Sequence, residues 1–250
     1  MRILLVGALG EVGQSLGAAL RHLGHEVVQV SSRVHPVESG VLSVDAGIRL
    51  IESGEVDLVV HAGGRGDKRS GDRDPLTITR RVGHACEVGG VRGVLISTVR
   101  VLEDAPGSVL GSAPVDCHTQ YARTNAANEQ EWLTGALTRG CVLRMANYFC
   151  APTEVDSPQT HLLPWSLVTE ALLSGRVSVR SAPSVSREFV SALDVARALV
   201  QISEAPEPPR ICSTLPGLSM SLKRLTDCVG DAFERSGRGR PAVTFGADEA

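Results

Sequence analysis

Three glycines follow an apolar run near the N-terminus and have the spacing of a phosphate-binding turn. The run RILLV (2–6) leads into GALGEVG, which places Gly7, Gly10 and Gly13 at GxxGxxG spacing before a helical pattern. A turn of this kind lets a pyrophosphate approach backbone N–H groups at the partly positive start of a helix. The alternative is a sharp strand-to-helix turn that binds nothing. Glu11 is discordant, because its carboxylate suits a phosphate site only if it points outward. The expected cofactor contacts in this turn are Gly7, Leu9, Gly10, Glu11, Val12 and Gly13.

The residues after the next two expected strands bear on the choice of dinucleotide. An acidic residue after the strand at 26–30 would bind the ribose hydroxyls of NAD, but here Ser31, Ser32 and Arg33 follow. Hydroxyls and an arginine suit the 2′-phosphate of NADP, so NADP is preferred and NAD remains an alternative. The less favoured alternative is that Arg33 is merely a solvated loop residue. After the third strand, Asp45 and its neighbour Ala46 are expected near the adenine, with turn capping as the alternative role of Asp45.

A parallel sheet is the structure that would hold these residues. Apolar runs at 2–6, 26–30, 41–44, 57–62, 93–98 and 141–146 alternate with helical patterns at 12–23, 47–53, 76–88 and 119–137. Strand–helix–strand alternation predicts an α/β fold, a doubly wound parallel sheet of the Rossmann type that is covered on both faces. After Cys150 the pattern changes to a proline-containing loop at 151–164, helices at 165–174, 192–202 and 219–234, and a strand at 176–180. We expect a dinucleotide-binding domain at 1–150 and a small substrate-binding cap at 151–250, interleaved with the core.

Composition excludes several classes of protein. The 250 residues carry a net charge of −3 and are 42% hydrophobic, which describes a globular chain with no general attraction to nucleic acid or membrane surfaces. No apolar run approaches the length of a membrane span. The six cysteines form no CxxC pair and no zinc-ligand spacing, so we expect reduced thiols, no metal and a cytoplasmic protein.

Several segments occur in an order that is familiar from one enzyme family. DLVVHAGG (57–64) resembles its fourth strand, ISTVRVLED (96–104) the strand that ends at the catalytic Ser/Thr, and QYARTNAANEQ (120–130) the YxxxK helix. LRMANYF (143–149) resembles the LRxxNxYG segment, and REFVSALDVARAL (187–199) resembles RDFVHVDDVA. The chain therefore resembles the extended short-chain dehydrogenase/reductases of the NAD-dependent epimerase/dehydratase type, particularly nucleotide-sugar epimerases, dehydratases and 4-ketoreductases.

The resemblance implies roles for particular residues. Tyr121 would be the acid/base and Thr98 would share the hydrogen bonds of the substrate oxygen, while hydride passes between the nicotinamide and a sugar carbon. Asn147 and Arg187 fall on positions that contact the substrate and its phosphates, although Arg187 could instead form a salt bridge. His61, Ala62 and Gly63 would lie along the nicotinamide, and a homodimer through paired helices is a further expectation.

The main departure from the family is Asn125, which occupies the lysine position of YxxxK. A lysine four residues after a tyrosine lies beside it on the helix and favours the phenolate. Asn125 could still bind a ribose hydroxyl and be a slower substitute, but it carries no charge. Arg123 lies on another helical face, and Lys68 belongs to a charged loop that is more simply solvated. The helix at 76–88 also has no clear match for an asparagine usually found there, and the C-terminal region is shorter than in most nucleotide-sugar enzymes.

Three functions follow from these residues. The leading hypothesis is an NADP-dependent reductase or epimerase that acts on a keto-sugar, nucleotide-sugar or similar polar carbonyl compound in specialised metabolism. The second is a non-redox elimination, isomerisation or cyclisation on the same fold. The third is an inactive NADP-sensing or protein-binding module, against which the presence of both Thr98 and Tyr121 argues.

Overall fold

The computed structural model describes residues 1–32, 40–63, 74–102, 119–136, 138–150, 162–214 and 218–246. The chain divides into two compact units. Unit 1 comprises residues 1–145 and 192–214, and unit 2 comprises residues 146–191 and 215–250. The backbone therefore passes from one unit to the other three times.

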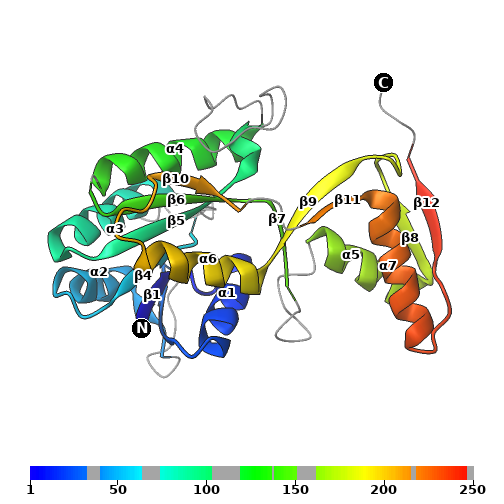
Figure 1. Ribbon diagram of the computed structural model, residues 1–250, viewed down its shortest axis with the longest axis horizontal. Coiled ribbons are helices and arrows are strands. Elements are labelled where there is room, and N and C mark those ends of the chain that lie inside the picture. The colour runs from blue at the N-terminus through cyan, green and yellow to red at the C-terminus, as the bar shows by residue number, and fades with distance from the viewer. Residues whose placement is uncertain are drawn as a thin grey trace. The chain divides into compact units, whose positions relative to one another are not determined.

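Unit 1 is built on a seven-stranded sheet in the order β10-β6-β5-β4-β1-β2-β3, in which every neighbouring pair is parallel (Figure 1). Its strands are β1 (Arg2–Val6), β2 (Glu26–Ser31), β3 (Leu42–Ser43), β4 (Leu58–His61), β5 (Arg92–Thr98), β6 (Gly140–Met145) and β10 (Ile211–Ser213). All of β4 and β6 is buried, as parallel strands covered on both faces should be.

Helices cover both faces of this sheet. Helices α1 (Glu11–His22) and α6 (Ala192–Glu204) pack together on one face, and α2 (Val44–Glu52), α3 (Pro75–Gly89) and α4 (Gln120–Gly135) pack side by side on the other (Figure 1). A 3₁₀ turn (Val99–Leu102) follows β5. The expected doubly wound Rossmann-type fold is confirmed.

The described residues of unit 2 form two small sheets and two helices. Strand β9 (Ser186–Ser191) lies between β7 (Asn147–Phe149), to which it is parallel, and β11 (Leu218–Ser221), to which it is antiparallel. Strand β8 (Arg176–Val179) pairs in parallel with β12 (Ala242–Phe245). Helices α5 (Leu163–Ser174) and α7 (Leu222–Arg235) contribute to an apolar core that includes Leu167, Phe189, Leu225 and Phe233.

The structure differs from several of the expected boundaries. Residues 192–214, which the sequence placed within the cap range, form α6 and β10 of unit 1. Helix α2 begins at Val44 because the Ser43 hydroxyl accepts a hydrogen bond from the Ala46 N–H and caps it. Helix α7 begins at Leu222 because 218–221 form a strand, and most of the loop expected at 151–164 lies outside the described residues.

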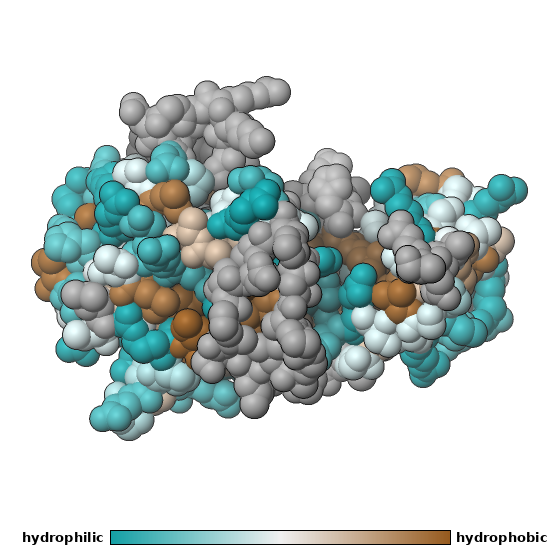
Figure 2. Space-filling view, turned by 90° about the horizontal axis from the view of Figure 1, so that it is seen from above, coloured by the Kyte–Doolittle hydropathy of each residue, from teal (hydrophilic) through white to brown (hydrophobic). Residues whose placement is uncertain are grey.

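The surface is mixed in character. Hydrophilic and hydrophobic residues alternate over the visible face of both units (Figure 2), as is usual for a folded chain of this composition. Within the described ranges, no helix combines the length and hydropathy that crossing a membrane would take.

Candidate functional site

The glycine turn after β1 is packed so tightly that side chains are excluded. Gly7 has a φ of +81°, and a Cβ there would lie 2.8 Å from the Gly63 nitrogen, at the end of β4. A Cβ on Gly13 would overlap the Gly7 carbonyl oxygen and lie 2.8 Å from the Ala8 Cα. The Gly7 and Ala8 N–H groups both donate to the Val30 carbonyl oxygen, at 2.9 and 3.1 Å, which ties the turn to β2. The turn therefore requires glycine at positions 7 and 13.

The same turn opens α1. Gly10 is the N-cap and makes no side-chain capping bond, so no side chain covers the start of the helix at that position. The Leu9 carbonyl oxygen accepts a hydrogen bond from the Gln14 side chain at 3.3 Å, and the half-buried Glu11 lies in the first turn. A helix that begins at Gly10 without a side-chain cap fits the pyrophosphate of a dinucleotide, because backbone N–H groups and the helix dipole both favour an anion.

The residues expected around the adenosine part of a cofactor are placed in different environments. Ser31 ends β2 and is buried, Ser32 is exposed, and Arg33 lies outside the described residues. The Asp45 carboxylate pairs with Arg81 of α3, and this hydrogen-bonded cation lowers the pKa of Asp45. Ser43, and not Asp45, caps this helix. An adenine amino group that bound Asp45 would have to share its carboxylate with Arg81.

The His61 side chain is buried in the interior of unit 1. Its ring is 1% exposed, and burial lowers its pKa to about 4, so the imidazole is neutral at pH 7. Nδ1 accepts from the Gly63 N–H at 3.4 Å, so Nε2 carries the proton and donates to the Thr79 hydroxyl at 2.9 Å. Thr79 donates in turn to the Asn128 side chain at 2.8 Å. The His61 side chain is therefore engaged inside the fold, and a cofactor contact by His61 stays a prediction, while Ala62 and Gly63 lie against the Gly7 backbone.

The two residues expected to do chemistry lie at the ends of β5 and α4. Thr98 is the last residue of β5 and is 9% exposed; its hydroxyl oxygen accepts from the Arg100 N–H at 3.2 Å, which leaves its own proton to donate. Tyr121 lies in the first turn of α4, behind the Thr119 cap, and is 42% exposed.

Asn125 lies one helical turn beyond Tyr121 and is buried. One amide N–H of Asn125 donates to the Tyr121 carbonyl oxygen at 2.9 Å, so part of its hydrogen-bonding capacity is used within α4. Arg123 is exposed, in agreement with its expected place on another helical face, and Lys68 lies outside the described residues. Neither the position of Asn125 nor that of Arg123 supplies the charge that a lysine would place beside the tyrosine.

A buried ion pair joins α4 to β6, and the sequence analysis did not predict it. Glu129 and Arg144 have side chains that are 4% and 2% exposed, and Arg144 Nη2 donates to Glu129 Oε2 at 2.7 Å. The Ser97 hydroxyl donates to Glu129 Oε1 at 2.5 Å. Only the spacing could have indicated that Glu129 faces the interior, because Glu129 lies four residues after Asn125 and so shares its helical face.

Asn147 and Arg187 belong to unit 2. The Asn147 amide donates to the Glu188 carbonyl oxygen at 2.9 Å, and Asn147 is paired with Phe189, two residues from Arg187 on the same strand. Arg187 is half-buried and donates to the Ser186 carbonyl oxygen at 3.3 Å. Across the described ranges, no carboxylate forms the salt bridge that was the alternative role of Arg187.

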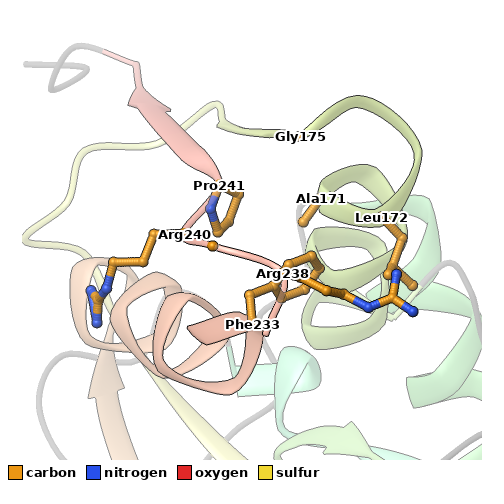
Figure 3. Close-up of a pocket in the computed structure, with 8 residues that line it drawn as sticks. Ala171, Leu172, Gly175, Phe233, Arg238, Arg240 and Pro241 are labelled. Carbon is orange, nitrogen blue, oxygen red and sulfur yellow. The ribbon is translucent and has the colours of Figure 1, made fainter. Parts of the chain in front are cut away.

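A separate cavity of about 320 Å³ lies between the ends of α5 and α7 in unit 2 (Figure 3). Its lining comprises Ala171, Leu172, Gly175, Phe233, Arg238, Gly239, Arg240 and Pro241. The Arg240 side chain points away from Leu172 and pairs with Asp231 and Glu234 of α7. The cavity contains none of the expected site residues and no acid/base pair, so it is not the candidate active site.

Comparison with known families identifies the class of this protein. Residues 3–212 match the NAD dependent epimerase/dehydratase family. The chain belongs to this family, and the resemblance inferred from its motifs is confirmed. A comparison with curated proteins found no match.

Solved structures with the same fold come from enzymes with several substrates. An NAD-dependent NDP-hexosamine 5,6-dehydratase involved in tunicamycin biosynthesis is 23% identical with a TM-score of 0.72, over 100% of this chain and 85% of that one. UDP-N-acetylglucosamine 4-epimerase from Bacillus cereus is 16% identical with a TM-score of 0.77, over 100% and 87% of the two chains. L-Threonine 3-dehydrogenase from Trypanosoma brucei is 18% identical with a TM-score of 0.74, over 99% and 84%. At these identities the likeness establishes the fold.

Proposed function

We propose that this protein is a nicotinamide-dinucleotide-dependent reductase or epimerase that acts on a keto-sugar, a nucleotide-sugar or a similar polar carbonyl compound. The observation that carries the proposal is the tight turn in which Gly7 and Gly13 have no room for a side chain, in the same unit as Thr98 and Tyr121. Family membership supports it, as do the sugar-nucleotide enzymes among the structural relatives. The third hypothesis, an inactive sensor, has no observation of its own in its favour.

The proposed mechanism assigns one task to each residue. The turn from Gly7 to Gly13 would bind the pyrophosphate, and a bound dinucleotide would supply or take up a hydride. The Thr98 hydroxyl donates a hydrogen bond to the substrate oxygen, and the Tyr121 hydroxyl passes a proton to or from that oxygen. Arg187 is assigned to a substrate phosphate, for which a guanidinium provides two parallel donors.

NADP is the proposed form of the cofactor. Ser31 is buried, so Ser32 and Arg33 would make the contacts that distinguish a 2′-phosphate from a hydroxyl. No acidic residue occupies positions 31–33, where it would repel that phosphate. The dehydratase relative is described as NAD-dependent, so both dinucleotides belong in the test.

The cofactor proposal is tested with Gly13→Ala. The added methyl group would overlap the Gly7 carbonyl oxygen and displace the turn, so the affinity for NADPH should fall by at least about tenfold, or 1.4 kcal/mol. Calorimetric titration with NADPH and NADH measures the loss and the preference between the two. Gly17→Ala, deeper in α1, is the matched control and should bind normally. Equal affinity of Gly13→Ala and the unaltered protein would contradict the proposed site; the milder Gly10→Ala replaces Gly13→Ala if that variant unfolds.

A second candidate is a reaction with no net change in the cofactor, such as an elimination or an isomerisation. The specific observation in its favour is Asn125, whose amide donates to the Tyr121 carbonyl oxygen and which brings no cation to the tyrosine. A general acid that need not become a stable phenolate suits such a reaction. Retention of cofactor without its net consumption would distinguish this candidate from a reductase.

The chemistry is tested with Tyr121→Phe and Asn125→Lys in one assay of NADPH oxidation with a keto-sugar. Tyr121→Phe removes the proton donor, and general acid–base catalysis contributes roughly 10²- to 10⁴-fold, so turnover should fall by at least that lower factor. Asn125→Lys should raise this rate if the protein is a weakened reductase, and should not produce net NADPH oxidation if the enzyme is specialised for a reaction without net cofactor change. Turnover that is unaffected by Tyr121→Phe would rule out the proposed role of the tyrosine.

A further inference from the structure

The Glu129 carboxylate joins three elements of unit 1. From α4 it accepts hydrogen bonds from Ser97 of β5 at 2.5 Å and from Arg144 of β6, through Nη2 at 2.7 Å and Nε at 3.1 Å. Ser97 and Arg144 lie directly opposite each other in the register of the two strands. One carboxylate thus fixes α4 against two neighbouring strands, in an interior where its side chain is 4% exposed.

A second polar connection starts at the preceding residue of the same helix. Asn128 accepts from Thr79 of α3, whose hydroxyl accepts from His61 of β4. Apolar packing is non-directional and leaves a helix some freedom to slide or rotate on a sheet. Hydrogen bonds to buried groups are directional, and a shifted helix would leave those groups unsatisfied. The polar inner face of α4 therefore restricts both its rotation and its axial position.

We propose that Ser97 and Glu129 are positioning residues that set the placement of Tyr121 relative to Thr98. Ser97 immediately precedes Thr98 on β5, and Glu129 is eight residues, about 12 Å of helix, beyond Tyr121 on α4. The bond between Ser97 and Glu129 therefore connects the two segments that carry the proposed reacting groups. This inference rests on the proposed function, in which both hydroxyls act on one substrate oxygen.

The absence of a lysine at position 125 makes this placement more important. With no cation beside Tyr121, the rate depends on the alignment of the two hydroxyls, and a misplacement of about 1 Å can cost about 10²-fold. An ion pair that was needed for stability alone could be replaced by apolar residues without penalty. The network of Ser97, Glu129 and Arg144 also holds the end of β5 and helix α4 in a fixed relative position.

The decisive variant is Ser97→Ala, which removes the bond from β5 and leaves the pair of Glu129 and Arg144 in place. The chain has two tyrosines, Tyr121 and Tyr148, so a protein labelled with ¹³Cζ-tyrosine gives two assignable resonances. In Ser97→Ala the Tyr121 resonance should change, while the Tyr148 resonance, from unit 2, stays in place. With substrate, kcat should fall about tenfold and KM should change less than twofold. Ser97→Thr, which keeps the hydroxyl, should restore both readouts.

Thr226→Val is the matched control, because Thr226 is also a buried hydroxyl, bonded to the Lys223 carbonyl oxygen within α7 of unit 2. It should lower thermal stability without altering the Tyr121 resonance. If Ser97→Ala behaves in the same way, with a lower melting temperature and an unchanged Tyr121 signal, the positioning role is refuted.

Ser97→Cys, nearly isosteric and a poorer donor, is used for the same readouts if the alanine variant does not fold. A shifted Tyr121 resonance in a protein whose Tyr121→Phe variant keeps full activity would refute the proposed function and leave the positioning of α4 supported.

Discussion

His61 shows how a single buried side chain couples this fold to pH. Its imidazole lies between the sheet and helices α3 and α4, with a ring-centroid distance of 6.0 Å to Trp132. The neutral tautomer satisfies both ring nitrogens, with Gly63 as donor and Thr79 as acceptor. A second proton would have to displace the Gly63 N–H and place a charge in an interior that cannot solvate it.

The pKa of His61 predicts a loss of stability on acidification. The ordinary value of 6.5 is lowered to about 4 by burial, so between these pH values the unfolded chain binds a proton that the folded chain does not. Stability is therefore complete above about pH 6.5 and falls as the pH drops towards 4, by roughly 3 kcal/mol over the whole window. Urea unfolding at pH 7, 6 and 5 measures this slope. His61→Asn should flatten it, and an unchanged slope in that variant would contradict the assignment.

The site residues that could be predicted from the sequence are those that local backbone geometry requires. Gly7, Gly10 and Gly13 are recognisable because a tight turn before a helix requires them wherever it occurs. The partners of Asp45 and Asn125 could not be predicted, because a side chain chooses among donors that only the folded chain brings near. Arg81, which pairs with Asp45, is 36 residues away in sequence.

Among the elements, the central strands were predictable and several peripheral ones were not. Strands β4 and β6 are mostly apolar, because both faces of the sheet are covered there, and this apolar run is what predicts them. Strand β12 is mostly exposed and joins β8 through backbone bonds, so its side chains carry no comparable pattern. Strands β7 and β10 have three residues each, which is too short for an alternating apolar and polar pattern to predict them.

One arginine explains why α6 belongs to unit 1 although unit 2 precedes it in the chain. Arg92, at the start of β5, donates from Nη1 to the carbonyl oxygens of Ile202, Ser203 and Ala205, at 2.8, 2.9 and 2.5 Å. These carbonyls are at or just beyond the end of α6, where a cation satisfies orphaned acceptors and the helix dipole. The buried side of α6, with Val195 and Leu199, packs at the α1 face of the sheet.

At the scale of the whole molecule, neither unit is a continuous stretch of chain. A fragment of residues 1–150 would match the domain boundary expected from sequence, but it would lack α6 and β10. The face of α1 that packs on α6 and the edge of β6 would then be exposed. We expect this fragment to show no cooperative thermal transition by circular dichroism, whereas the full chain should. A sharp transition in the fragment would show that residues 192–214 are dispensable to unit 1.

The discontinuity of unit 1 also bears on how the protein is made. Synthesis proceeds from the N-terminus, and domains generally fold as their residues leave the ribosome. Strands β1 to β6 emerge early, yet the helix that covers α1 and the strand that closes the β6 edge are translated only after residues 146–191 of the other unit. The nascent chain must therefore keep an apolar helix face and an unpaired strand edge from aggregating until residue 214 is available, which makes this interval the vulnerable period in its biogenesis.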